Sequence, residues 1–408
     1  MKKRVWIFNH YAEPPQYEVR VRNNVMAKYL MKAGYDVTIF AASTIHNTDI
    51  NLITDGSEYI RREYDGLKFV HIKSPDYSGN GLARKINLLL FPFNLWRVTK
   101  KIGEKPDVII NDLDVMAFDF PFMIAKRYGV PIITEVRDLW PESLVDYGYL
   151  NRDSLLAKFL YLMEKRMYKK SSMVVFTMEA GYEYIKERGW EEALPLSKVR
   201  YINNGVDLKV FRENCALYQT MDDDLDDPDT FKVVYAGSIR RVNNLGLLLN
   251  AAKYVKNPKV KFLIWGAGDE TEELKQRVQE EHIDNVIFKG AVEKKYVPYI
   301  TTKADLNIAH NTPSPIFRFG ISFNKVFDYI AAGKPILSDF PSKFNPAVQW
   351  GAGVEVSDPT AENIAKAIEE FANMQPEAYQ VFEEKARIAA EEYDYENLTQ
   401  KMIDLIEA

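Results

Sequence analysis

Two series of short apolar runs, separated by an acidic stretch, restrict the fold of this chain more than any other feature. In the first half, most runs of β-branched and apolar residues are followed by a longer segment with helical periodicity. Such alternation, with nearly continuous apolar strands, predicts a parallel sheet covered by helices on both faces. The expected strands of this half lie at 5–8, 37–40, 69–72, 108–110, 131–134 and 173–176.

The alternation stops at residues 218–230 and then begins again. This stretch has no apolar periodicity and many aspartates, which is typical of a linker or a solvated loop. A chain of 408 residues is also too long for one ordinary core. We therefore expect an α/β protein with two doubly wound, Rossmann-like domains. The strands expected in the second half lie at 231–237, 260–268, 286–290, 305–309, 335–340 and 353–356.

The domains are expected at residues 1–205 and 206–395, and a helix from about 396 is expected to pack back on the first domain. In open parallel sheets, ligands bind beyond the carboxyl ends of the strands. Two such domains facing each other would form a ligand cleft between these ends, and closure of the cleft is expected to accompany function. The segments at 203–207 and 393–397 are the expected hinge and crossover.

Composition limits the classes of partner. The formal net charge of -5 argues against a general attraction to nucleic acid. Cys215 is the only cysteine, so no intramolecular disulfide can form, which fits a reducing, cytoplasmic compartment. The apolar run at the start ends at Phe8, whereas the core of a signal peptide needs roughly 7–15 apolar residues. We interpret this run as a buried strand.

An uncharged segment, INLLLFPFNLW at 86–96, has two interpretations. It is shorter than the about 20 apolar residues that span a bilayer. It is either a buried helix or a helix that docks on the inner face of the cell membrane, with basic residues as anchors. The flanking basic residues are Arg84, Lys85, Arg97, Lys100 and Lys101.

Features that suit a phosphate follow the strand at 231–236. Gly237 and Ser238 form a tight turn, Arg240 and its neighbour Arg241 lie in that turn, and a helix is expected from about Asn243. A helix amino end offers unpaired N–H groups and a positive dipole end. The alternative is that the two arginines are simply solvated. A second glycine turn, with Gly266 and Gly268, is weaker evidence of the same kind.

The segment ISFNKVFDYIAAGKPIL at 321–337 predicts a further helix. Ser322 or Asn324 is expected to cap its amino end, and Gly333 can adopt the left-handed conformation that ends it. Lys325 and Asp328 are three residues apart and share one face. A lysine there can hold a diphosphate, and the aspartate can accept hydrogen bonds from two sugar hydroxyls. The alternative is an exposed ion pair between these two side chains.

Seven segments in order carry a resemblance to a known family: 28–43, 133–143, 164–178, 202–211, 233–239, 262–270 and 323–337. The chain resembles the GT-B glycosyltransferases of glycosyltransferase family 4. It is most similar to the branch that builds bacterial surface polysaccharides, such as O-antigen. The resemblance implies transfer of a sugar from a nucleotide diphosphate, most often UDP, with retention of configuration. It implies no cofactor, usually no metal, and a glycan or polyprenyl-linked acceptor.

The resemblance implies that the second domain binds the donor. Lys325 and Arg240 would neutralise the diphosphate, and Asp328 would hold the ribose hydroxyls. Many members carry an acid where this chain has Gly320, so backbone N–H groups of Gly320 to Ser322 would hold the donor sugar instead. The other residues expected around the donor are Gly237, Ser238, Gly266, Gly268, Val292 and Ile321.

The first domain departs from the family in two places. The loop at 9–22 contains no glycine, and its polar candidates are His10, Arg20 and Arg22. Arg137-Asp138 stands where relatives often have His-Asp. Both side chains are expected near the donor sugar or the acceptor hydroxyl, with a structural ion pair as the alternative.

Other functions remain open at this stage. The chain could be a non-catalytic relative that binds a sugar nucleotide or serves as a partner subunit, or a sugar-nucleotide epimerase. A dinucleotide-dependent oxidoreductase is disfavoured because no G-x-G-x-x-G follows the first strand. Two D-x-D patterns, Asp112 with Asp114 and the run at 222–229, resemble metal sites, but no metal is expected.

Overall fold

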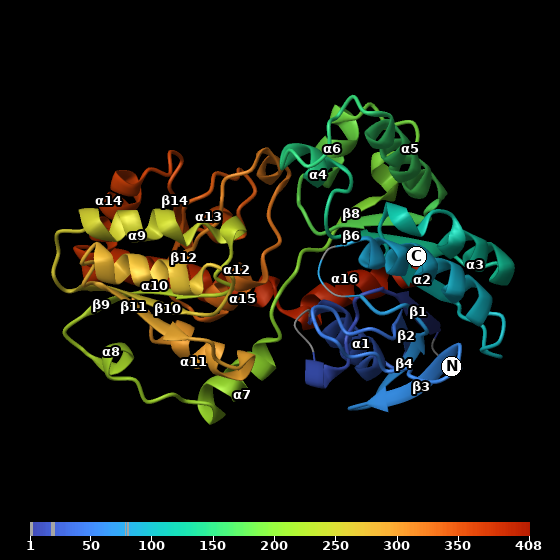
Figure 1. Cartoon of the computed structure of the whole chain (residues 1–408), viewed down its shortest axis with the longest axis horizontal. Helices are drawn as coiled ribbons and strands as arrows, with labels where there is room; N and C mark the ends of the chain where they lie inside the picture. Colours follow the sequence, from blue (N-terminus) through green and yellow to red (C-terminus); the bar gives the residue numbers. More distant parts are fainter. Residues whose placement is uncertain (1–2, 18–20, 78, 80) are drawn as a thin grey trace. The chain divides into compact units, whose positions relative to one another are not determined.

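The computed structural model describes residues 3–17, 21–77, 79 and 81–408. The chain divides into two compact units (Figure 1). Unit 1 contains residues 1–203 and 398–408, and unit 2 contains residues 204–397. The expected boundaries after 205 and 395 lie two residues from these.

Unit 1 contains an eight-stranded sheet in the order β3-β4-β2-β1-β5-β6-β7-β8. All neighbouring strands are parallel except β3 and β4, which are antiparallel. Except for the short edge strand β8, the parallel strands are buried along almost their whole length, which explains their continuous apolar sequences. The strands are β1 (Arg4–Phe8), β2 (Asp36–Ala42), β3 (Tyr59–Tyr64), β4 (Leu67–Ile72), β5 (Val108–Asn111), β6 (Ile132–Val136), β7 (Met173–Phe176) and β8 (Val199–Tyr201).

Helices follow most parallel strands of unit 1, and α16 completes the unit. Lys3 Nζ donates a hydrogen bond to the Ile406 carbonyl at 2.5 Å, and the Tyr35 hydroxyl donates to Glu407 at 2.5 Å. These contacts hold the end of the chain against the start of the sheet. The helices are α1 (Arg22–Lys32), α2 (Leu82–Val98), α3 (Phe120–Tyr128), α4 (Glu142–Asp146), α5 (Leu155–Lys170), α6 (Gly181–Glu187) and α16 (Tyr395–Glu407).

Unit 2 contains a six-stranded, fully parallel sheet in the order β11-β10-β9-β12-β13-β14. Neighbouring residues of β9 point to opposite faces, where separate apolar clusters form. Val234 packs with α7, α11 and α12, and Val233 packs with α9, α10 and α14. The strands are β9 (Phe231–Ala236), β10 (Val260–Trp265), β11 (Val286–Gly290), β12 (Leu306–Ala309), β13 (Ile336–Ser338) and β14 (Gly353–Glu355).

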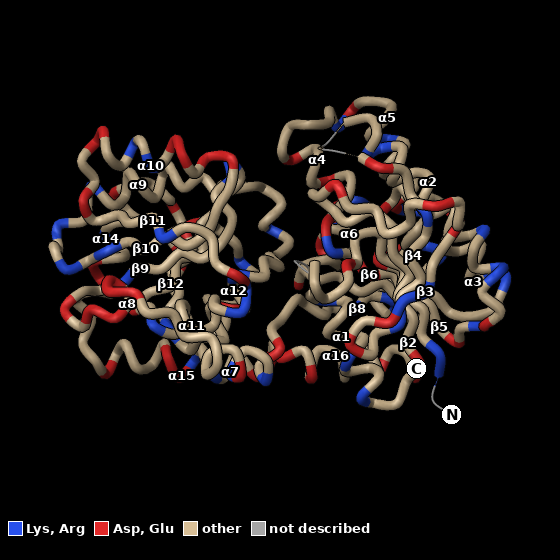
Figure 2. Tube along the Cα trace, turned by 60° about the horizontal axis from the view of Figure 1, so that its bottom comes forward, with Lys and Arg blue, Asp and Glu red and all other residues tan. Residues whose placement is uncertain are grey.

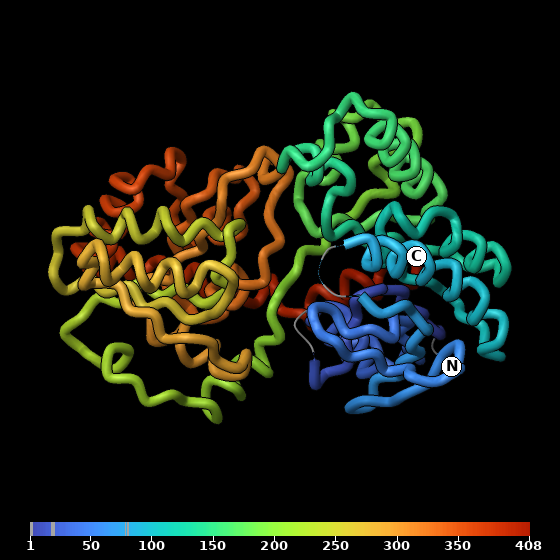
Figure 3. Tube along the Cα trace, in the orientation of Figure 1, coloured from blue at the N-terminus to red at the C-terminus, as the bar shows by residue number. Residues whose placement is uncertain are grey.

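Figure 3 traces the backbone of unit 2 by residue number, and the strands and helices drawn in Figure 1 alternate along it. Together with unit 1, this confirms the predicted α/β class with two Rossmann-like domains. The helices are α7 (Leu208–Leu217), α8 (Asp223–Asp226), α9 (Leu245–Tyr254), α10 (Thr271–Glu280), α11 (Val297–Thr302), α12 (Asn324–Ala331), α13 (Pro346–Gln349), α14 (Ala361–Ala372) and α15 (Pro376–Glu392).

The aspartate-rich stretch is part of unit 2, so the alternative of a linker between the domains was wrong; apart from the short helix α8 it is a loop in which only Leu225 is buried. Asp222 caps the short helix α8, which is red in Figure 2. Lys289 Nζ lies 2.6 Å from carboxylate oxygens of both Asp222 and Asp224, and Lys303 pairs with Asp226 at 3.1 Å. Lysines from β11 and α11 therefore attach this segment to the domain.

Candidate active site

Lys325 lies in a polar cage at the carboxyl end of β9. Its Nζ donates hydrogen bonds to the Tyr235 hydroxyl at 3.2 Å, to Asn243 Oδ1 at 3.3 Å and to the His310 carbonyl at 3.3 Å. The ammonium also lies 4.7 Å from the centroid of the Tyr235 ring. All of these partners are neutral. Burial lowers the pKa of Lys325 to about 8, and the charge of Asp339 opposes that shift.

His310 and Asp339 form a buried pair beneath the cage, and both side chains are fully inaccessible to solvent. His310 Nδ1 contacts Asp339 Oδ2, and Nε2 lies 2.7 Å from the Asn244 carbonyl. Both ring nitrogens of His310 therefore face oxygen atoms with which they can form hydrogen bonds. The pair fixes Asn244, which has a left-handed backbone (φ 49°) before α9.

The turn after β9 is held by hydrogen bonds to one carbonyl. The Ser238 carbonyl accepts from the Tyr235 hydroxyl at 2.8 Å and from Asn243 Nδ2 at 2.7 Å. Asn243 therefore connects this turn to Lys325. Arg240 lies further along the turn, is exposed, and forms no ion pair with any residue that the structure describes. The exposed Arg240 and the half-buried Lys325 thus place two cationic residues in the region of this turn.

Gly266 and Gly268 support the turn through close packing. A Cβ atom at Gly266 would lie 1.8 Å from the Gly237 carbonyl oxygen, and one at Gly268 would lie 1.9 Å from the Ile239 carbonyl oxygen. The backbone also joins here, because Gly237 N–H donates to the Trp265 carbonyl at 3.0 Å. Backbone packing against the β9 turn is therefore sufficient to explain both glycines, with no contact to a ligand.

The amino end of α12 lies beside the cage and has no side-chain cap. Its N-cap residue is Phe323, so the predicted caps by Ser322 or Asn324 were wrong. Within the described ranges, the buried hydroxyl of Ser322 has no hydrogen-bond partner. An uncapped helix amino end next to a lysine suits an anion. At the other end, Gly333 adopts the predicted left-handed conformation, with φ of 67°.

Gly320 has a backbone conformation, φ 108° and ψ 172°, that is essentially restricted to glycine. This explains why no acid stands at that position. Its N–H donates to the Phe317 carbonyl at 3.0 Å. The expectation that Gly320 to Ser322 all offer backbone N–H groups was therefore wrong for Gly320. Ile321 next to it is buried.

Asp328 lies one helical turn beyond Lys325 but does not pair with it. Across the residues with described positions, its half-buried carboxylate accepts no hydrogen bond. Burial raises the pKa of Asp328, and the charge of Lys294 opposes the shift. The alternative of an exposed Lys325–Asp328 ion pair was wrong. Val292 lies on the exposed loop after β11.

In unit 1, Arg137 pairs with Asp112, and its Nη1 lies 2.9 Å from Asp112 Oδ2. Asn9 Nδ2 donates to the same carboxylate oxygen at 2.6 Å, and burial raises the Asp112 pKa. Asp138 is exposed, and Arg137 pairs with Asp112 instead of with Asp138. Asp114 caps a short turn by accepting from the Met116 N–H. Among described residues, no cluster of three metal-ligating side chains is found.

The polar candidates of the first loop have structural roles. His10 is buried, its Nε2 lies 2.5 Å from Asn87 Oδ1, and burial lowers its pKa to about 4. Arg22 is also buried, and its Nη2 lies 2.6 Å from Glu135 Oε1. Both side chains therefore have buried structural partners within unit 1. Arg20 lies outside the described residues.

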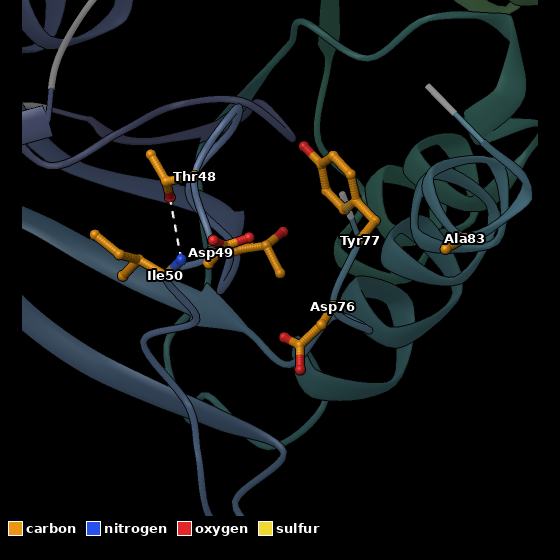
Figure 4. A pocket seen from close by; sticks show the side chains of 7 residues that line it. Thr48, Asp49, Ile50, Asp76, Tyr77 and Ala83 are labelled. Carbon is orange, nitrogen blue, oxygen red and sulfur yellow. Dashed lines mark hydrogen bonds between the residues drawn. The ribbon is translucent and has the colours of Figure 1, made fainter. Parts of the chain in front are cut away.

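A cavity of about 460 Å³ opens between loops of unit 1 (Figure 4). Asp76 accepts a hydrogen bond from Asn51 Nδ2 at 2.6 Å, and the Tyr77 hydroxyl lies 2.8 Å from His46 Nδ1. Asp49 has no hydrogen-bond partner among the described side chains. The cavity follows the carboxyl ends of β2 and β4. It is lined by Thr44, Thr48, Asp49, Ile50, Asp76, Tyr77 and Ala83.

Sequence patterns did not indicate this cavity, because its residues are ordinary polar loop residues far apart in the chain. Two carboxylates, threonine hydroxyls and one aromatic ring can bind a ligand rich in hydroxyl groups. They disfavour an anion. The chemistry of this cavity is thus opposite to that of the Lys325 cage.

Comparisons with known proteins match both units. The family model "Glycosyltransferase Family 4" matches residues 20–210, and "Glycosyl transferases group 1" matches residues 220–389. A curated relative, the probable glycosyltransferase WbjE of Pseudomonas aeruginosa, is 23% identical over 277 residues. That match spans 67% of this chain and 66%, just under two thirds, of the relative.

Solved structures show the same fold over the whole chain. Sucrose-phosphate synthase of Thermosynechococcus elongatus has a TM-score of 0.71 at 16% identity, and the match covers 100% of this chain and 98% of that one. HepE of Anabaena with UDP and glucose has a TM-score of 0.66 at 13% identity and full coverage of both chains. An Escherichia coli trehalose-6-phosphate structure with UDP-2-fluoro glucose has a TM-score of 0.73 at 11% identity, covering 99% of each.

These findings define the class of the protein. Its two Rossmann-like domains have the GT-B fold, and each domain matches a glycosyltransferase family model. Each domain therefore belongs to a glycosyltransferase family, and the two together have the GT-B fold.

Proposed function

We propose that the chain transfers a glycosyl group from a nucleotide-diphosphate sugar to a glycan or lipid-linked saccharide in bacterial surface polysaccharide synthesis, with retention of configuration. The observation that carries this proposal is Lys325, a half-buried lysine whose ammonium has only neutral partners, at an uncapped helix amino end. HepE binds UDP and glucose in its solved complex, which supports a UDP-sugar as the donor.

The donor diphosphate would lie between Lys325, the amino end of α12 and Arg240. An anion there would replace the weak neutral contacts of Lys325 with charge-assisted hydrogen bonds, which are about twice as strong as neutral ones. Asp328 lies one turn further along the helix, and its unpaired carboxylate can accept hydrogen bonds from the two ribose hydroxyls. Burial raises the pKa of this carboxyl, and such hydrogen bonds would stabilise its charged form.

The reaction breaks the bond between the anomeric carbon and the diphosphate oxygen, and the electron pair stays on that oxygen. The acceptor hydroxyl oxygen bonds to the anomeric carbon, and its proton passes to the departing phosphate on the same face. Lys325, Arg240 and the amino end of α12 would stabilise the growing negative charge. We propose that this arrangement acts without a metal. Gly320 supports a mechanism without a carboxylate nucleophile, because its backbone excludes an acid at that position.

We place the saccharide acceptor in the unit 1 cavity. Asp49 and Asp76 can accept hydrogen bonds from sugar hydroxyls, and Tyr77 supplies an aromatic ring. The cavity follows the carboxyl ends of two parallel strands, which is the edge where ligands bind in this architecture. Arg137 and Asp138 follow β6, another strand of the same sheet.

A thermal-shift screen with UDP, GDP and their sugars tests the donor site. A ligand that binds the native state raises the melting temperature, so UDP and one or more UDP-sugars are expected to stabilise the protein. No shift with any nucleotide would contradict the donor site. Gly320 also favours one alternative, a non-catalytic relative that binds sugar nucleotides. That alternative predicts the same shift with neither donor hydrolysis nor transfer.

A further inference from the structure

Three helices of unit 1 expose a large share of the protein's solvent-accessible apolar side chains. On α2, the exposed side chains recur at helical spacing from Leu82 to Phe93, and on α5 they recur from Leu155 to Leu162. Leu155 is 87% exposed and Leu82 is 73% exposed. Contiguous exposed apolar patches of this kind mark interaction sites. We name this surface the α2–α5 face. Its apolar members are Leu82, Ile86, Leu89, Leu90, Phe93, Met123, Leu155, Leu156, Phe159 and Leu162.

Aromatic contacts join the helices into one surface. The ring centroids of Phe93 on α2 and Phe120 at the start of α3 are 5.7 Å apart. Two residues earlier, Phe118 lies 6.4 Å from Phe159 on α5. These contacts connect α2 to the start of α3, and the segment just before α3 to α5, so the exposed apolar residues lie on neighbouring elements of unit 1.

The same helices are basic. Neither α2 nor α3 contains an acidic residue, and the only one of α5, Glu164, is fully buried against Tyr168 and Tyr184. The helices carry ten Lys and Arg residues, in a chain with a formal net charge of -5. Three of these basic residues pair with acids outside the helices: Arg97 with Glu58, and both Arg166 and Lys170 with Asp119. The face therefore bears a positive charge that the rest of the chain does not share.

Two lysines lie within the apolar stripes themselves. Lys85 follows Leu82 by three residues and precedes Leu89 by four, and Lys158 has the same spacing to Leu155 and Leu162. Residues three and four apart are neighbours on a helix. Both lysines are exposed and have no acidic partner in the described part of the chain. Such lysines can extend their amino groups toward phosphates while their stems stay in an apolar layer.

We propose that the α2–α5 face docks on an anionic lipid bilayer. An apolar surface with interspersed lysines is complementary to the boundary between acyl chains and negatively charged headgroups. A second copy of the chain is a poorer fit, because pairing through this face would bring like charges together. Within the described ranges, no helix is long and apolar enough to cross a bilayer, so the contact would be interfacial. This proposal does not depend on the donor site.

Co-sedimentation of the full chain with vesicles tests the proposal. Vesicles of phosphatidylcholine alone are compared with vesicles that contain about one third phosphatidylglycerol. The double variant Lys85→Glu/Lys158→Glu should bind the anionic vesicles at least about tenfold more weakly than the wild type, because each basic residue near the surface contributes about 1 kcal/mol. Lys256→Glu/Lys259→Glu in unit 2 is the matched control and should bind as the wild type does.

A second pair of variants tests the apolar side chains of the α2–α5 face. Leu82→Glu/Leu155→Glu places acids in the first turns of α2 and α5, where helices tolerate them, and should weaken binding similarly. Leu196→Glu/Leu217→Glu changes two exposed leucines elsewhere and should have no effect. A cooperative thermal unfolding transition near the wild-type melting temperature checks that each variant is folded. Equal vesicle binding by face and control variants would overturn the proposal. So would concentration-dependent dimerisation of the wild type that Leu82→Glu/Leu155→Glu abolishes, because it would identify a second copy as the occupant.

Discussion

The ammonium of Lys325 lies 3.2 Å from the hydroxyl of Tyr235 and 4.7 Å from the centroid of its ring. Because Tyr235 donates its own proton to the Ser238 carbonyl, it can accept from Lys325 without competition. The lysine is thus held in place by neutral groups, which leave its positive charge free to interact with an anion. An anionic ligand would be the strongest partner in reach.

The affinity for UDP should fall as the pH rises through 8. The pKa of Lys325 in the free protein is about 8, so the protonated fraction falls about tenfold with each pH unit above it. Because the bound diphosphate favours the ammonium form, binding takes up a proton in this range. Calorimetry in buffers of different ionisation enthalpy measures that uptake. Lys325→Arg, which stays charged, should show no uptake above pH 8, and equal uptake in both proteins would contradict the assignment.

Restoring an acid at Gly320 should destabilise the protein rather than improve catalysis. The backbone at φ 108° and ψ 172° is strained for any residue with a side chain. We expect Gly320→Asp to lower the free energy of unfolding by about 1–3 kcal/mol in urea denaturation. Gly56→Asp is the control, because Gly56 is exposed and a Cβ there meets no atom. If both variants are equally stable, the conformational explanation of Gly320 is wrong.

Asp49→Asn should raise the KM for the saccharide acceptor and leave the donor site unaffected. A hydrogen bond to a charged group contributes about 1.5–3 kcal/mol, so we expect an increase of about tenfold or more. The UDP-induced thermal shift should stay at its wild-type value. Asp65→Asn, on the turn between β3 and β4, is a control for the loss of one carboxylate. An unchanged KM would contradict the proposal that the acceptor binds in this cavity.

Transfer should persist in excess EDTA. In the proposed site, Lys325, Arg240 and the amino end of α12 supply the positive charge that a divalent cation supplies in other enzymes. Initial rates with and without chelator are the measurement. A rate that falls with EDTA and returns with added Mg²⁺ or Mn²⁺ would contradict a metal-independent mechanism.

The parallel strands were predictable because burial on both faces makes them continuous apolar runs. β3 was missed because it is an edge strand, and its central residues Arg61, Arg62 and Glu63 are exposed and charged. β8 was missed because it has three residues and none is buried. The ion pairs of the aspartate run could not be predicted, because the lysines that bind it, Lys289 and Lys303, lie more than sixty residues away in the chain.

The candidate site was predictable only where one helix carries the pattern. Lys325 and Asp328 share a helical face, which their spacing of three residues in the sequence already indicates. The cage around Lys325 is formed by Tyr235, Asn243 and His310, which come from separate segments, so no local spacing could indicate it. The role of Gly266 likewise depends on a carbonyl 29 residues earlier in the chain, at Gly237.

Turnover of Lys325→Ala with a UDP-sugar is the most direct test of the account. Loss of one preorganised donor to the leaving diphosphate should lower turnover by about 10²–10³-fold and weaken UDP binding in a folded protein. Lys334→Ala, just past the other end of α12, removes a lysine that pairs with Glu383 and should retain wild-type turnover. Wild-type turnover and UDP affinity in folded Lys325→Ala would contradict the central claim.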